Sequence, residues 1–322
     1  MSAFFRLLCA AIVLIVSGGF IHAEEWPSRP IRLIVSYPPG GTADLMARTV
    51  SVPLGKILGT SVVVENKPGA SGQIAAGYVA KAPADGYTLL LDASSFSVNP
   101  SLFPKLPYDP LKDFKTLAVL AQYPNVLLVH PSFPAKSVKD LIAMAKAKPN
   151  TIAYASSGNG SAQHLAGVLF EVRANVDMQH IPYKGGGPAL NDVLGGQVPV
   201  FFGSVASTKP HVESGKLIAL AVTGRNRAAS LPNTPIMSEA GVPGYEVYEW
   251  NGIFAPAATP SGVTSKLSDA ISKVMQSGEV REKVLGLSGE PFQGGADAAD
   301  KFIRAQMAEW AKLVKSGKIS VD

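Results

Sequence analysis

Short apolar runs rich in β-branched residues alternate with amphipathic segments along the first third of the chain. The runs at 31–35, 62–64 and 88–91 predict strands, and the segments 43–58 and 73–81 predict helices between them. This alternation is typical of βαβ units, in which parallel strands form a sheet with helices on both faces. The first third of the chain therefore predicts an α/β structure.

The same alternation restarts after a proline-rich stretch around 100–110. Strands are predicted at 126–129, 152–155, 178–181, 198–202 and 217–222, with helices from Ser137, over 162–172 and 188–194, and around His211. Three amphipathic helices follow at 263–275, 279–287 and 297–315. Two such blocks in 322 residues predict two α/β lobes, each a mostly parallel sheet flanked by helices. We place the crossings between lobes near Gln122 and Trp250, so that 24–122 and 251–322 form lobe 1 and 123–250 forms lobe 2.

The N-terminus has the pattern of a secretory signal peptide over 1–23. Arg6 supplies a positive charge, an uncharged apolar run covers 7–16, and Ala23 offers a small residue for cleavage, although a nearby site stays open. The apolar run is too short to span a bilayer of about 30 Å. Cys9 is the single cysteine and lies within this leader. We therefore predict an exported, periplasmic protein without disulfides or cysteine chemistry.

Charge and missing motifs argue against several other functions. The net charge of +5 is spread along the chain without a run of Lys or Arg, so no nucleic-acid surface is predicted. The sequence contains no G-x-S-x-G elbow, phosphate-binding loop of the G-x-x-x-x-G-K-[ST] type, or H-E-x-x-H motif. The histidines after the leader have no metal-site spacing. We predict no catalytic residues, no cofactor and no metal.

Five loops rich in glycine and small polar residues follow predicted strands. Ligands of open α/β sheets bind at the carboxyl ends of strands, where loops lead into helices whose N-termini favour anions. Each loop alone is as well explained by a tight strand-to-helix turn, and Gly158-Asn159-Gly160 only approaches a dinucleotide-binding motif. His164 alone is most readily explained as a packed histidine. The predicted ligand-binding residues are Tyr37, Pro39, Gly40, Gly41, Thr42, Asp44, Ser94, Ser95, Phe96, Ser157, Gly158, Asn159, Gly160, Ser161, His164, Tyr183, Lys184, Gly203 and Ser204.

Several motifs along the chain, some of them in these loops, occur in the same order in one known family. They are WPSRPI at 26–31, PPGGTAD at 38–44, VENKPGASG at 64–72, DGYTLL at 85–90, NP at 99–100, the segment 154–164, PYKGGGPAL at 182–190, LAVT at 220–223, EAGVPGY at 239–245 and FAP at 254–256. The chain is similar over nearly its whole length to the solute-binding proteins of tripartite tricarboxylate transporters, the Bug-type receptors. It departs at Gly203, where similar proteins commonly have Asp or Asn.

The resemblance implies a two-lobed, type II periplasmic binding protein of the Venus flytrap kind. It implies capture of a small carboxylate between the lobes, held mainly by backbone N–H groups, hydroxyls and bridging waters, and delivery to membrane permease subunits. We expect a monomer. The alternative functions are an enzyme that acts on a small carboxylate and a ligand sensor for a signalling partner. The identity of the acid is not readable from the residues.

Overall fold

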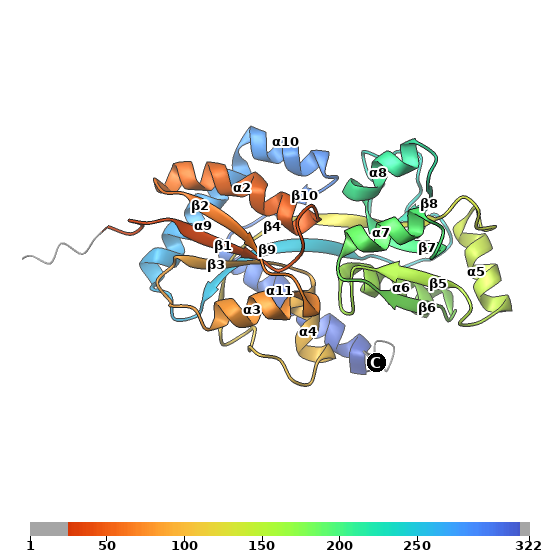
Figure 1. Cartoon of the computed structure of the whole chain (residues 1–322), viewed down its shortest axis with the longest axis horizontal. Coiled ribbons are helices and arrows are strands. Elements are labelled where there is room, and N and C mark those ends of the chain that lie inside the picture. The colour runs from red at the N-terminus through yellow and green to blue at the C-terminus, as the bar shows by residue number, and fades with distance from the viewer. Residues whose placement is uncertain (1–24, 316–322) are drawn as a thin grey trace, which may run out of the picture.

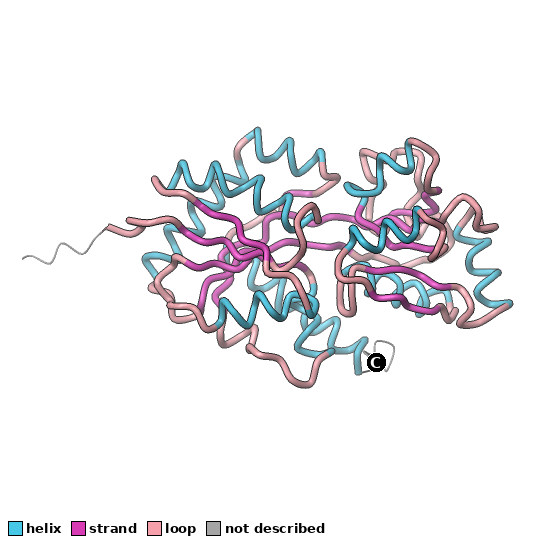
Figure 2. Tube along the Cα trace, viewed as in Figure 1, coloured by secondary structure: helices cyan, strands magenta, loops and turns pink. Residues whose placement is uncertain are grey.

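The computed structural model describes residues 25–315, which form two α/β lobes joined by long strands (Figures 1 and 2). The predicted signal peptide at 1–23 lies outside the described residues. The first lobe contains β1 (Ile31–Val35), β2 (Val62–Asn66), β3 (Thr88–Ala93), β10 (Glu290–Pro291), the 3-10 helix η1 (Ala70–Gly72), α2 (Thr42–Leu58), α3 (Gln73–Ala80), α4 (Ser95–Leu102), α9 (Ser261–Gln276), α10 (Gly278–Gly286) and α11 (Ala296–Lys315). The second lobe contains β5 (Ala153–Ser156), β6 (Gln179–Pro182), β7 (Val200–Ser204), β8 (Ile218–Val222), α5 (Val138–Ala147), α6 (Ala162–Ala174), α7 (Gly186–Leu194) and α8 (Val205–Glu213).

Each lobe has a set of parallel strands. In the first lobe the order is β2-β1-β3, with Ile31 opposite Val62 and Arg32 opposite Thr88. In the second lobe β6, β5 and β7 are parallel. Each set is completed by antiparallel strands that belong to the connection between the lobes. The mostly parallel two-lobed architecture predicted from the alternating pattern is therefore confirmed.

Two long strands run between the lobes. The strand β4 (Phe114–Val129) pairs with β9 (Tyr248–Pro256) over its first part and with β7 and β8 over its last part. The strand β9 lies between β3 and β4, and Gln122 is opposite Trp250 in the β4–β9 ladder. One continuous hydrogen-bonded sheet thus passes through both lobes.

Helices cover both faces of each half of this sheet, which explains the nearly unbroken apolar runs of the strands. In the first lobe α2, α9 and α10 pack on one face with Leu33 and Leu89, and α3, α4 and α11 pack on the other with Ile34 and Leu90. In the second lobe α5 and α6 cover one face, and α7 and α8 cover the other.

Two first-lobe helices also contribute to the core of the second lobe. Leu102 at the end of α4 and Trp310 near the end of α11 are buried in the same apolar cluster as Leu169 and Phe170 of α6. The helix α11 begins against the first-lobe sheet, where Ala299 and Ile303 are buried. It therefore contacts both lobes.

The sequence pattern predicted β4 only in part, and it missed β9, α4, η1 and β10. The strand predicted at 126–129 is the end of β4, which begins at Phe114, because Pro124 and the polar Lys115, Thr116 and Gln122 obscure the apolar run. The strand β9 was not predicted, and α4 was not predicted because Pro100 and several Ser and Asn residues disfavour a helix. Among residues 25–315, the helices are too short or too polar to cross a membrane.

Candidate ligand-binding cleft

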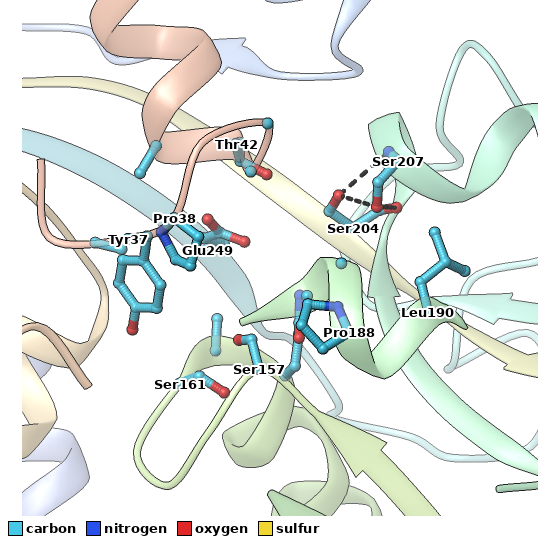
Figure 3. Close-up of a pocket in the computed structure, with 18 of the residues that line it drawn as sticks. Tyr37, Pro38, Thr42, Ser157, Ser161, Pro188, Leu190, Ser204, Ser207 and Glu249 are labelled. Carbon is cyan, nitrogen blue, oxygen red and sulfur yellow. Dashed lines mark hydrogen bonds between the residues drawn. The ribbon is translucent and has the colours of Figure 1, made fainter. Parts of the chain in front are cut away.

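A cavity of about 310 Å³ lies between the two lobes (Figure 3). It is enclosed by the loop after β1, the loop after β5, the starts of α7 and α8, and one side chain of β9. Its lining residues are Tyr37, Pro38, Pro39, Gly40, Gly41, Thr42, Ala43, Ala93, Ser157, Ser161, Ala162, Gln163, Gly186, Gly187, Pro188, Leu190, Ser204, Ser207 and Glu249. The cavity is thus built from loops at the carboxyl ends of strands in both lobes.

Four helix N-termini meet at this cavity. They belong to α2, capped by Gly41, to α6, capped by Ser161, to α7, preceded by Gly185, and to α8, capped by Ser204. The first N–H groups of a helix have no acceptor within the helix, and the helix dipole places partial positive charge there. Thr42 and Ala162, the first residues of α2 and α6, both line the cavity. The arrangement attracts an anion although no Lys or Arg lines this cavity.

Asp44 holds the loop before α2 in shape and does not line the cavity. Its carboxylate accepts hydrogen bonds from Gly40 N at 3.0 Å, Arg48 Nε at 3.0 Å and Asn66 Nδ2 at 2.9 Å. Burial alone would raise the pKa of Asp44, but the hydrogen bonds from Arg48, Gly40 and Asn66 outweigh it and keep the pKa below its ordinary value. Gly40 has φ of 83°, a conformation that favours glycine.

The loop before α6 is held by His164. Gly160 N donates to His164 Nδ1 at 3.0 Å, and His164 N donates to the capping Ser161 Oγ at 3.2 Å. The ring of His164 stacks on His180 with 4.0 Å between centroids. Burial lowers the pKa of His164 to about 3, with a further contribution from His180, and burial lowers the pKa of His180 to about 4. Both rings are therefore neutral at neutral pH.

Gly160 and His164, which the sequence analysis predicted to bind the ligand, lie behind the loop that lines the first cavity. The Gly160 N–H is already bonded to His164, and a Cβ at Gly160 would lie 3.0 Å from Leu102 Cδ2 on the first-lobe helix α4. Gly160 allows close approach of the lobes, and His164 supports the loop from behind. Neither residue lines the cavity.

Four further predicted residues also lie outside the cavity. Ser94 Oγ accepts from Trp250 N at 2.9 Å, and Ser95 Oγ accepts from the Tyr37 hydroxyl at 3.0 Å. Phe96 stacks on Phe254 at 4.2 Å in the first-lobe core. A Cβ at Gly203 would lie 2.5 Å from the ring of Phe201 and 2.7 Å from Thr208 Cγ2, so this position in β7 is closely packed.

A second cavity of about 380 Å³ adjoins the first and shares Tyr37, Pro38 and Ser157 with it. The predicted residues Gly158, Asn159, Tyr183 and Lys184 line this second cavity rather than the first. Ser71 Oγ, from the first lobe, donates to the carbonyl of Asn159 in the second lobe beside it. The Tyr183 hydroxyl donates to Asp192 at 2.6 Å.

The sequence analysis did not select several residues that line the first cavity. Gln163, Gly186, Gly187 and Pro188 belong to loops it had identified, and their position at helix starts was the available signal. Leu190 and Ser207 lie about one turn into α7 and α8. Glu249 had no usable signal, because its strand β9 was not predicted.

Glu249 is the one charged side chain among the residues lining the first cavity. Burial raises the pKa of its carboxyl group to about 7. In Figure 3 the carboxylate points into the space between Thr42 on α2 and Ser204 at the start of α8. Within residues 25–315 there is no group of three or more His, Cys, Asp and Glu side chains that could hold a metal ion.

Comparison with known proteins identifies the family. Residues 46–319 match the tripartite tricarboxylate transporter family receptor. The chain belongs to this family. BugT of Bordetella pertussis is 36% identical over 315 residues, which cover 96% of this chain and 97% of BugT. The Bug-type resemblance inferred from the loop motifs is therefore confirmed.

Solved structures of similar proteins have the same fold. A protein of R. palustris solved with adipate is 36% identical, has a TM-score of 0.87, and is matched over 92% of this chain and 99% of its own. MatC of R. palustris, solved with bound malate, is 31% identical with a TM-score of 0.84 over 90% of this chain and 100% of its own. Because the family to which the chain belongs is one of transporter receptors, the chain is a binding protein and not an enzyme.

Proposed function

We propose that this receptor captures a small organic acid in the first cavity, with the carboxylate held at the N-termini of α2 and α6. The observation that carries the proposal is the meeting of four helix N-termini at a cavity lined by no Lys or Arg. Exposed N–H groups and hydroxyls at helix starts bind carboxylates without a cationic side chain. The relatives solved with adipate and malate support a carboxylate ligand.

The direct binding residues in this proposal are the predicted Tyr37, Pro39, Gly40, Gly41, Thr42, Ser157, Ser161 and Ser204, joined by Ala162, Gln163 and Ser207. Gly158, Asn159, Tyr183 and Lys184 extend the site into the second cavity. Asp44, Gly160 and His164 act through the loops that they hold.

The working motion is closure of the lobes around the ligand. We propose that the boundaries lie where β4 and β9 cross, with 24–122 and 251–322 in lobe 1 and 123–250 in lobe 2. The loaded, closed receptor would deliver the acid to the permease subunits of a tripartite transporter. A leader at 1–23, removed on export to the periplasm, and a monomeric receptor complete the proposal.

Removal of a single N–H group tests the carboxylate site. Ala162 is the first residue of α6, a position where proline fits the helix but carries no N–H. Ala162→Pro should weaken binding of the best acid in a panel of mono- and dicarboxylates by at least about tenfold, because a hydrogen bond to a charged group is worth about 1.5–3 kcal/mol. Isothermal titration calorimetry measures the change.

The control is Gly278→Pro, at the first position of the exposed helix α10, where a side chain meets open space. It introduces the same ring at a helix start far from the cavity and should leave the dissociation constant unchanged. Equal affinity of both variants and the unmodified protein would place the carboxylate elsewhere. Recovery of a chemically altered acid would contradict the receptor function itself.

A further inference from the structure

A further cavity, of about 540 Å³, is lined by residues of both lobes and lies behind the strands that join them. Successive side chains of a strand point to opposite faces. On β9, Glu249 lines the first cavity, whereas its neighbours Tyr248 and Trp250 line this further one. Gln122 of β4, opposite Trp250, lines it too. We call it the back cavity, because the joining strands separate it from the ligand cleft.

The two walls of the back cavity carry opposite charges. The second lobe contributes Arg173 of α6 and Arg225 from the loop after β8. The first lobe contributes Glu290 of β10 and Glu309 of α11. Glu246, the one acid among the second-lobe residues of the lining, is paired with Arg225 at 3.0 Å. A basic wall therefore faces an acidic wall across the cavity.

These opposite charges are close to each other but not paired across the cavity. Among the ion pairs within residues 25–315, none joins the two walls, and Arg225 is paired with Glu246 of its own lobe. Glu290 nevertheless acts on Arg225. The pKa of Arg225 is raised, first by its hydrogen bond with Glu246 and more weakly by the charge of Glu290. The cavity thus separates charges that would pair if the two lobes approached each other on this side.

The ligand cleft and the back cavity are linked, because the lobes turn about the strands that lie between them. A hinge rotation that separates the loops of the ligand cleft also narrows the space behind the joining strands. At the cleft the lobes are in contact, through Ser71 and the carbonyl of Asn159. The structure thus has a narrow cleft and a wide back cavity, and opening of the cleft reverses both.

We propose that the back cavity holds the unliganded receptor open. When the cleft opens, the acidic wall of the first lobe meets the basic wall of the second, and Glu290 pairs with Arg225. This pairing exists only in the open form, so it competes with ligand binding, which needs the closed form. Glu290 therefore sets the affinity for the ligand without touching it. The inference rests on the lobe closure of the proposed function.

Neutralising and then reversing the charge of Glu290 tests the inference. Glu290 is exposed, and its side chain makes no hydrogen bond or ion pair within residues 25–315. Glu290→Gln removes the attraction to Arg225, so the dissociation constant for the best acid of the panel should fall about two- to fivefold. Glu290→Lys replaces attraction by repulsion and should tighten binding further. Titration calorimetry measures both, and 1 M salt should reduce the effect, because it screens exposed charges.

Small-angle scattering gives a second readout that does not depend on the ligand. The unliganded Glu290→Lys receptor should have a smaller radius of gyration than the unliganded unmodified receptor, because a larger fraction of it is closed. A residue with only a structural role would not move this value toward that of the liganded form. Thermal unfolding of each unliganded variant verifies that the fold is retained.

The matched controls are Glu282→Gln and Glu282→Lys. Glu282 lies on the exposed helix α10 of the same lobe and does not line the back cavity. The two controls change the net charge equally, so they account for the long-range attraction between an added positive charge and an anionic ligand. They should leave the dissociation constant and the radius of gyration nearly unchanged.

The possible failures can be told apart. If Glu290→Lys binds the acid no more tightly than the unmodified receptor, or if Glu282→Lys tightens binding equally, the inference is overturned while carboxylate capture stands. An unliganded Glu290→Lys receptor as extended as the unmodified one would also overturn it. If saturating ligand leaves the scattering of the unmodified receptor unchanged, lobe closure fails and the inference fails with it. If no acid of the panel binds, the proposed function and the inference both fail.

Discussion

Single residues control how closely the elements around the cleft approach. Gly167 of α6 faces Tyr154 of β5, beneath the helix start that lines the cavity. A Cβ at Gly167 would lie 2.2 Å from the Tyr154 ring. Because Tyr154 is fully buried, the ring has no free space to move into. The position of α6, and so of its N-terminus, depends on the absence of a side chain at Gly167.

Gly167→Ala should therefore lower the free energy of unfolding by about 1–3 kcal/mol, in spite of the better helix propensity of alanine. Urea denaturation followed by circular dichroism measures the change. Gly262→Ala in α9 is the matched control, since a Cβ there meets open space. It should stabilise the protein by up to about 1 kcal/mol. A stabilising Gly167→Ala would show that Tyr154 has room to shift.

Among single residues, the sequence pointed to those cleft residues that lie at the start of a helix after a strand. It missed cleft residues that lack such a local pattern. Thr42, Ser161 and Ser204 lie at helix starts after strands, a pattern visible along the chain, and all three line the cavity. Phe96 and Gly203 lie in similar loops or strand ends, but they face Phe254 and Phe201. Which side of a loop faces the cleft depends on contacts between distant segments.

Among the elements, α6 and β6 are joined by a stacked pair of histidine rings, of which His164 is buried and His180 is half-buried. His164 of α6 stacks on His180 of β6, and His180 Nε2 is 2.6 Å from Ser156 Oγ at the end of β5. The folded pKa values of about 3 and about 4 lie below the ordinary value of 6.5, so the unfolded chain binds more protons below pH 6.5. Their contribution to stability is complete above pH 6.5 and is lost as the pH falls toward 4.

We expect the pair to remove at least about 2 kcal/mol from the free energy of unfolding between pH 6.5 and pH 5. His164→Asn keeps an acceptor for the Gly160 N–H but cannot titrate, so its slope against pH should be smaller. Denaturant unfolding at several pH values measures both slopes. Asp92 and Glu249, with pKa values raised by burial to about 6 and about 7, act in the opposite direction. The difference between variant and unmodified protein is therefore the quantity to compare, and parallel curves would contradict the prediction.

Helices and strands were predictable where the hydrophobic pattern within one segment is enough to define the element. The helix α2 has one apolar face that repeats along its length. The strands β1 and β3 are nearly unbroken apolar runs, because both faces of the sheet are covered. The strands β4 and β9 change surroundings along their length, from the first lobe to the crossing, and so mix apolar with polar residues. The pairing of β4 with β9 depends on tertiary contacts that the hydrophobic pattern of the sequence does not contain. The position of Glu249 on β9 was therefore not predictable either.

At the scale of the whole molecule, closure depends on contacts across the cleft. Ser71 of η1 donates to the carbonyl of Asn159 in the loop before α6, and Asn99 Nδ2 donates to Ser71 O at 2.9 Å. In the proposed closure, the contact between Ser71 and Asn159 forms only when the lobes come together. It stabilises the closed form, which is the form that a ligand touching both lobes binds.

Ser71→Ala should weaken ligand binding about fivefold, since one hydrogen bond contributes about 1 kcal/mol. Small-angle scattering should show a smaller radius of gyration with the ligand bound for the unmodified protein, and the variant should need more ligand to reach the same value. Ser132→Ala, at an exposed hydroxyl that contacts only His130 in its own lobe, is the control. Scattering that is unchanged by saturating ligand would contradict lobe closure.

The position of β9 between β3 and β4 also affects the order in which the molecule can assemble. The strands of the second lobe all lie between residues 114 and 222, whereas the first-lobe sheet stays divided until residues 248–256 arrive. When the chain emerges from a ribosome or a membrane channel with its N-terminus first, the second lobe is the first to have all its strands outside. Domains generally fold as units, so this lobe can fold first. The lobe that contains the beginning of the chain is therefore the last to be completed. Glu249 and α11 arrive with that last step, so a partly delivered chain has no finished cleft in which to bind its solute.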